Sequence, residues 1–220
     1  MFALSAFGQG DRGTITGVIS DPAGSVVACA SIEAKNSATG VVFQSASTAT
    51  GNYTLGQLPI GTYEINVTVP GFKKYTRAGL TVQALQTLRV DVPLEIGSSS
   101  ESVTVTESAT LLKTETGDVS HNVTSNKVND LPVGTLGAIR NPLTASQLIP
   151  GTNVVSGSTL RISGTPVNSE QVRVDGLDAT YSLGMSTYSF GQPSVDAIQE
   201  IAIQTSNFAA EYGQAGGRRI

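Results

Sequence analysis

Apolar and polar residues alternate in short runs between Gly13 and Ile96. Thr62–Val69 and Leu88–Leu94 show the alternation most clearly, because every second position in each segment is apolar. The apolar positions of the two segments are Tyr63, Ile65, Val67, Val69, Leu88, Val90, Val92 and Leu94. A period of two predicts β-strands that bury one face and expose the other.

Clusters of Gly, Pro, Asn and Asp separate these runs, at residues 21–24, 36–40, 50–52, 59–61 and 70–71. Such residues favour turns, because they supply a fixed φ, a positive φ or a local side-chain hydrogen bond. Short strands that alternate with turns at this spacing are typical of a β-sandwich. We therefore predict a sandwich over residues 13–96.

The pattern changes after a short Gly-Ser joint at Gly97–Ser100, which marks a linker over residues 97–107. Less regular strands are expected beyond it, at 103–105, 161–162, 171–174 and 198–204. We also expect a short helix near Ser125 and a longer helical stretch over Leu136–Leu148, interrupted at Asn141-Pro142. These elements predict a second, α+β domain over residues 108–220, so the fold class is mainly β.

Composition excludes several classes of protein. The net charge of −4 and the absence of a basic stripe argue against binding to nucleic acid. No segment carries the roughly 18 apolar residues of a membrane-spanning helix. The single cysteine, Cys29, cannot form an intramolecular disulfide, and we expect it to be a small buried core residue.

The first twelve residues resemble a truncated signal segment, because Ala6 and Gly8 have the spacing that a signal peptidase reads. We therefore expect the protein to be exported.

Residues for catalysis are missing. The only histidine, His121, lies in a polar stretch without an obvious nucleophile, and one His with one Cys cannot form a zinc site. Asp175–Asp178 lacks the oxygen-dense spacing of a calcium loop and predicts a turn instead. We expect no enzyme activity, no metal and no cofactor.

The first domain resembles a known family in its turns and core positions. Gly13–Gly24, Gly51–Leu55, Leu58–Tyr63 and Pro70–Phe72 are similar to the carboxypeptidase-regulatory-like domain. That resemblance implies a transthyretin-like sandwich, often grouped with carbohydrate-binding-like folds. The chain has no Trp for sugar stacking, and we place Tyr53, Tyr63 and Phe72 in the core.

The second domain resembles the plug domain of TonB-dependent outer-membrane receptors. The similar segments are Ser125–Pro132, Gln147–Gly151, Arg161–Ser169, Val172–Leu177, Gln192–Ile201 and Gln204–Gly217. Gly217–Ile220 departs from the family pattern, because two adjacent arginines stand where small residues usually lead into a barrel strand. The two resemblances together imply the N-terminal part of such a receptor, with the barrel absent from this chain.

The resemblance also implies a coupling segment, the TonB box, before the plug. Its candidate residues are Glu101, Ser102, Val103, Thr104, Val105 and Thr106. Their β-branched side chains favour the extended backbone with which a strand can add to a TonB sheet. The alternative is an ordinary strand of the sandwich or the plug. Tyr181, Tyr188 and Phe190 are candidates for ligand contact, with loop packing as the alternative.

The function expected from the resemblance is gated uptake through an outer-membrane barrel, with the chain on the periplasmic side. The partners would be the TonB C-terminal domain, a barrel on the same or a separate chain, and a transported ligand of unknown identity. A different class remains open: a secreted carbohydrate-binding or adhesion module built on the sandwich.

Overall fold

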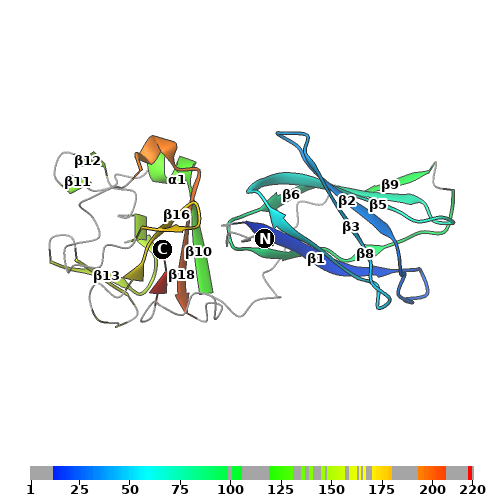
Figure 1. Cartoon of the computed structure of the whole chain (residues 1–220), viewed down its shortest axis with the longest axis horizontal. Helices are drawn as coiled ribbons and strands as arrows, with labels where there is room; N and C mark the ends of the chain where they lie inside the picture. The colour runs from blue at the N-terminus through cyan, green and yellow to red at the C-terminus, as the bar shows by residue number, and fades with distance from the viewer. Residues whose placement is uncertain are drawn as a thin grey trace, which may run out of the picture. The chain divides into compact units, whose positions relative to one another are not determined.

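The computed structural model describes residues 12–98, 101–105, 119–130, 135–136, 139–140, 145–146, 148–156, 159–162, 164, 166, 170–179, 193–206 and 218–219. The chain divides into two compact units. One spans Asp11–Thr116 and the other contains Gly117–Ile220. The elements of both units are labelled in Figure 1.

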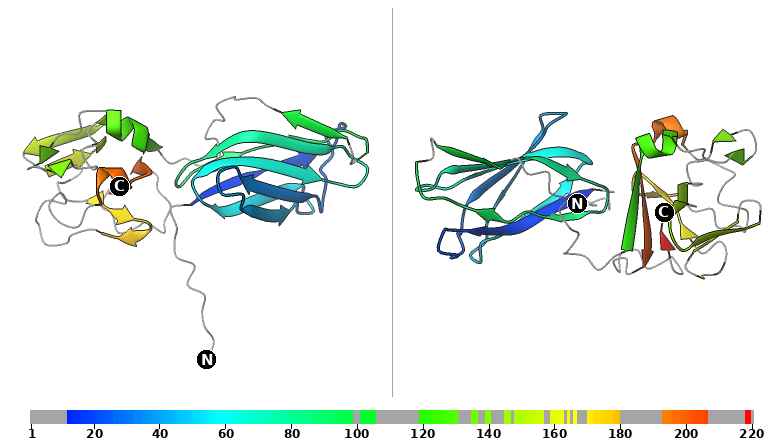
Figure 2. Two further views of the ribbon diagram at one scale, coloured as in Figure 1. Left: turned by 90° about the horizontal axis from the view of Figure 1, so that it is seen from above. Right: turned by 180° about the vertical axis from the view of Figure 1, so that it is seen from behind.

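Two sheets form the first unit. The first contains β4 (Asn52–Leu58), β1 (Gly13–Ser20) and β7 (Thr87–Arg89) in that order, with β8 (Val92–Pro93) also paired to β1. The second has the order β3 (Val42–Ala46), β2 (Ser31–Asn36), β5 (Gly61–Thr68), β6 (Lys74–Val82) and β9 (Ser102–Val105). The views in Figure 2 show the two sheets as stacked layers, so the predicted sandwich is confirmed.

Apolar side chains from both sheets fill the space between the layers. The eight alternating positions from Tyr63 to Val69 and from Leu88 to Leu94 are all buried, with exposed fractions of 7% or less. Tyr53 is also buried, and Phe72 packs against this core while partly exposed. The period-two pattern therefore identified the buried face correctly.

The predicted turns have the side-chain hydrogen bonds that explain them. Asp21 Oδ1 accepts hydrogen bonds from the backbone N–H groups of Ala23 and Ser25, at 2.9 and 2.8 Å. Asn36 Oδ1 accepts from Ala38 and Thr39 in the same way, at 2.9 and 3.0 Å. Short polar side chains thus satisfy backbone donors where the chain reverses.

The prediction for Cys29 is wrong, because its side chain is exposed. Cys29 has a φ of 55°, a left-handed backbone conformation that is uncommon outside glycine. Its N–H donates to the Ser47 carbonyl at 3.1 Å, while the next residue, Ala30, is the one that is buried. The prediction relied on the residue type, because free cysteine is usually buried, and this local conformation exposes its side chain instead.

The second unit contains a sheet of order β10 (Val119–Thr124), β18 (Glu200–Ser206), β19 (Arg218–Arg219) and β15 (Glu170–Gln171). Short pairs accompany it: β11 (Thr135–Leu136) with β12 (Ile139–Arg140), β13 (Thr152–Ser156) with β14 (Thr159–Ile162), and β16 (Arg173–Val174) with β17 (Leu177–Asp178). The helix α1 (Ser125–Asp130) lies where a short helix was expected, and a 3-10 turn, η2, covers Val195–Ala197. The mainly β fold class is thus confirmed.

The longer helix predicted over 136–148 is wrong. Leu136 and Ile139 are paired in the β11–β12 hairpin instead. Gly137 is costly in a helix, and Pro142 cannot supply the backbone donor that a helix requires. The apolar residues of this stretch gave a helical period that these two residues override.

The turn predicted at Asp175–Asp178 is confirmed. Asp175 and Gly176 have φ values of 49° and 80°, and they connect β16 to β17. Two consecutive positive φ values are typical of a two-residue hairpin turn, for which Asp-Gly is a preferred sequence.

Among the residues that the structure describes, no helix is long and apolar enough to cross a bilayer.

Candidate functional site

The segment predicted as a TonB box lies at the edge of the five-stranded sheet. Ser102–Val105 form β9, which is the last strand of that sheet and runs parallel to β6. The register pairs Lys74 with Ser102, Thr76 with Thr104 and Arg77 with Val105. β9 is therefore extended, as the β-branched residues predicted, but it pairs with the sandwich within the stretch predicted as a linker. Thr106 lies outside the described residues.

The direction of the backbone hydrogen bonds of β9 follows from one hydrogen bond and the register. Lys74 N–H donates to the Glu101 carbonyl at 2.9 Å, and Lys74 is the partner of Ser102. In a parallel ladder, alternate residues direct both backbone groups to the same neighbouring strand. Val103 and Val105 therefore direct their N–H and C=O groups to β6. Ser102 and Thr104 direct theirs away from it.

The side chains of β9 alternate as well. Val103 and Val105 are half-buried, and Val105 packs against the sandwich core, whereas Ser102 and Thr104 are exposed. Half-burial of a valine stabilises the strand by about 1 kcal/mol. The four residues of β9 are thus held by one set of ladder bonds and two partly buried side chains.

Charged side chains anchor the start of β9. Lys73 Nζ lies 3.3 Å from Glu95 Oε2 and 3.6 Å from Glu101 Oε2, so it connects the end of the core sandwich to β9. The hydrogen bond from Lys73 to Glu95 is the main reason that the pKa of Lys73 is raised above its ordinary value of 10.5. A Cβ at Gly97 would overlap the Lys73 stem, so glycine lets the lysine lie across the joint. These are surface ion pairs, which contribute little to stability.

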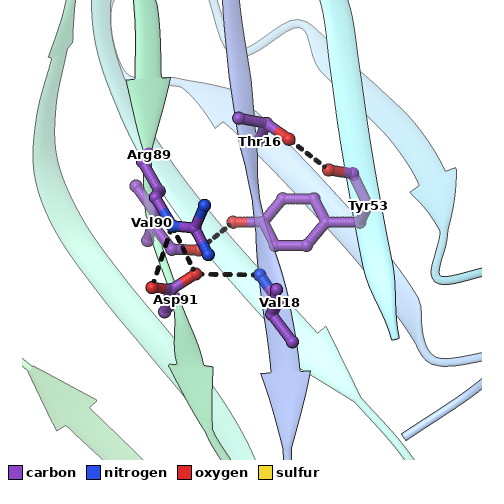
Figure 3. Close-up of polar contacts among 6 residues, drawn as sticks. All are labelled: Thr16, Val18, Tyr53, Arg89, Val90 and Asp91. Atoms are coloured by element: carbon purple, nitrogen blue, oxygen red, sulfur yellow. Dashed lines mark hydrogen bonds and ion pairs between the residues drawn. The ribbon is translucent and has the colours of Figure 1, made fainter. Parts of the chain in front are cut away.

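The strands β7 and β8 of the other sheet are held by side-chain hydrogen bonds as well as by backbone pairing. β7 and β8 pair in parallel with β1, and the Asp91 side chain fills the break between them by accepting the Val18 N–H at 2.9 Å. The Tyr53 hydroxyl donates to the Val90 carbonyl at 2.7 Å (Figure 3). Burial is the main reason that the pKa of Tyr53 is raised above 10.0. β9 is held instead by its ladder with β6, the ion pair between Lys73 and Glu101, and the half-buried Val103 and Val105.

The remaining candidate residues give little for chemistry. Tyr181, Tyr188 and Phe190 lie outside the described residues. Tyr53 and Tyr63 are almost completely buried, so neither can stack on a sugar. His121 lies in β10, and no group of three metal-ligating side chains occurs in the described part of the chain. The described site offers backbone hydrogen bonds at a sheet edge rather than a reactive side chain.

Comparison with known proteins gives two informative matches. Residues 14–95 match the family model described as "Carboxypeptidase regulatory-like domain". The chain is also 27% identical over 230 aligned residues to the TonB-dependent transporter Oar of Myxococcus xanthus. That alignment covers 99% of this chain and 20% of the relative, so the chain spans about a fifth of the relative's length. These matches confirm the resemblance to the N-terminal region of a TonB-dependent receptor, and they point to a non-enzymatic protein.

Solved structures give weaker likenesses. A putative carbohydrate-binding protein from Bacteroides uniformis is 19% identical, with a TM-score of 0.33, over 37% of this chain and 40% of that one. Hydroxyquinol 1,2-dioxygenase from Pseudomonas putida is 8% identical, with a TM-score of 0.33, over 42% and 59%. Neither likeness bears on function.

Proposed function

We propose that this chain is the N-terminal part of a TonB-dependent outer-membrane receptor, exposed to the periplasm, and that the TonB C-terminal domain binds it at β9. The observation that carries the proposal is the position of Ser102–Val105 as an edge strand of the sandwich sheet, before the second unit in the sequence. The similarity to a TonB-dependent transporter over nearly the whole chain supports the identity of the partner.

The second unit would act as the plug of the receptor. Its described core is small, formed mainly by Val123, Val128, Ala145, Ile149, Val172, Val195, Ile201 and Ile203. Leu148 and Leu177 are 54% and 75% exposed, so both side chains are available for contact with a barrel wall. We infer that this unit fills a barrel lumen, with domain boundaries of 13–96 for the sandwich, 97–107 for the coupling segment and 108–220 for the plug.

The mechanism follows from strand addition. A TonB strand would form main-chain hydrogen bonds with β9, which gives affinity without a specialised side chain. Force applied by TonB at residues 101–106 would pass along the chain to the plug and rearrange it. Substrate could then enter through the barrel, and contact with Tyr181, Tyr188 and Phe190 is part of this proposal.

The test uses the whole 220-residue chain and the purified TonB C-terminal domain. Val103→Pro removes a backbone donor from the β6 side of β9, and Thr104→Pro removes one from the opposite side. If TonB pairs with β9, at least one of the two variants should weaken binding at least about tenfold. Val42→Pro is the matched control, because Val42 is an exposed valine at the start of the edge strand β3. Binding that survives both Val103→Pro and Thr104→Pro, in chains whose circular dichroism is unchanged, would contradict the proposal.

A further inference from the structure

We propose that TonB binds β9 while β9 remains paired with β6, through the outer edge formed by Ser102 and Thr104. The sandwich sheet and the TonB sheet would then become one continuous intermolecular sheet. This inference rests on the proposed function and specifies which side of the strand the partner uses.

The outer edge of β9 is open to a partner. β9 ends the sheet order β3-β2-β5-β6-β9, so no described strand pairs on its far side. The Lys74 N–H bond to Glu101 and the register with Ser102 direct the backbone groups of Ser102 and Thr104 to that side. Both side chains are exposed, so they leave room for a neighbouring strand. An open strand edge of this kind is a template for strand addition.

Pairing with β6 prepares β9 for this partner. The four residues are already extended and ordered, so a TonB strand that adds to the outer edge does not have to order them. A partner that used the inner edge would first break the β6 ladder. The hydrogen bonds between that partner and β9 would only replace those between β6 and β9. The number of hydrogen bonds would therefore not increase.

The side chains of β9 favour the same edge. Val103 and Val105 are half-buried, and Val105 packs against the core of the sandwich. Both contacts persist if TonB adds to the outer edge, because side chains and backbone groups leave a strand in perpendicular directions. Release of β9 would expose both valines to water, which opposes binding.

A reversible cross-link tests the inference directly. Thr76 and Thr104 are paired across the β6–β9 ladder, and neither side chain is buried. Their replacement by cysteine, in a chain that also carries Cys29→Ser, allows a disulfide to hold β9 on β6. The chain with Cys29→Ser and Thr104→Cys alone is the control for the altered side chain.

We expect the oxidised chain to bind the TonB C-terminal domain within about threefold of its reduced form. If oxidation weakens binding at least about tenfold and reduction restores it, the inference is wrong, while the proposed function stands. If the unmodified chain fails to bind TonB at all, the proposed function itself fails.

Hydrogen exchange of the unmodified chain gives an independent measurement. By the ladder geometry, the Thr76 N–H donates to the Val103 carbonyl. Protection of the Thr76 and Val103 amides should persist in the complex, and protection should appear at Thr104. If Thr76 and Val103 lose protection when TonB binds, β9 has left β6 and the inference is overturned.

Discussion

The Tyr53 hydroxyl donates a 2.7 Å hydrogen bond to the carbonyl of Val90, which joins β4 to the segment between β7 and β8. The Val90 carbonyl also lies against Gly17, and the Val90 N–H donates to the Thr16 carbonyl at 2.7 Å. These contacts position β7 and β8 beside β1. We therefore expect the core of the sandwich to hold when β9 is loosened.

Gly17→Ala should be strongly destabilising. A Cβ at this position would overlap the Val90 carbonyl and contact the Tyr53 ring. Because both neighbours are held by the hydrogen bond between them, we expect a loss of about 3 kcal/mol in the free energy of unfolding. Urea unfolding measures it. Gly56→Ala is the matched control, since a Cβ there meets nothing within 4 Å; equal effects at the two positions would contradict the packing argument.

Tyr53→Phe should change how stability depends on alkaline pH. Burial raises the pKa of folded Tyr53, so above pH 10.0 the unfolded chain ionises this group first. The contribution of Tyr53 is therefore complete below pH 10.0 and is lost as the pH rises further. The variant should lose about 1–2 kcal/mol at neutral pH but show a flatter decline above pH 10. Parallel pH profiles of the two proteins would show that Tyr53 is not responsible.

Asp91→Ala should destabilise the sandwich by about 1 kcal/mol, because the Val18 N–H loses its side-chain acceptor. Asp91→Asn keeps an oxygen at the same position and should retain most of the stability. Thermal unfolding of the two variants provides the comparison. If both substitutions cost the same, the negative charge and its contact with Arg89, at 3.1 Å, matter more than the hydrogen bond.

Lys73→Gln should loosen β9 without affecting the core. The substitution removes both ion pairs that connect Lys73 to Glu95 and Glu101. Amide exchange at Val103 should become about two- to fivefold faster, while exchange at Val67 in the central strand β5 stays unchanged. Lys35→Gln, at an exposed lysine of β2, is the control. An effect of similar size at Val67 would mean that β9 and the core unfold together.

Heating should separate the two units of the chain. The sandwich has an extensive core and should give a distinct calorimetric transition. The second unit has a smaller described core with exposed Leu148 and Leu177, so it should give little or no cooperative heat absorption. A single sharp transition that includes both units would contradict this expectation.

Local patterns predicted the sandwich well, because burial at Tyr63, Ile65 and Val67 follows directly from alternation. The residue type misled at Cys29, where a left-handed backbone conformation leaves a usually buried side chain exposed. Local patterns failed at Leu136 and Ile139, where glycine and proline override an apolar period.

The sequence left open whether residues 102–105 form a strand of the sandwich, and it did not identify β6 as their partner. Parallel pairing joins segments that are distant in sequence, and neither segment records its partner in its own pattern. One signal was available: acidic Glu95 and Glu101 lie on either side of the Gly-Ser joint, where a single lysine can reach both. That arrangement favours a folded joint over a mobile one.

Cys29 has a practical consequence. It is the only thiol in the chain, and it lies on the surface of the sandwich. A fluorophore or spin label can therefore be attached to the native sequence at a unique position. One engineered cysteine in the second unit would complete a donor–acceptor pair, and spectroscopy could then follow how far the two units separate when the chain is placed under load.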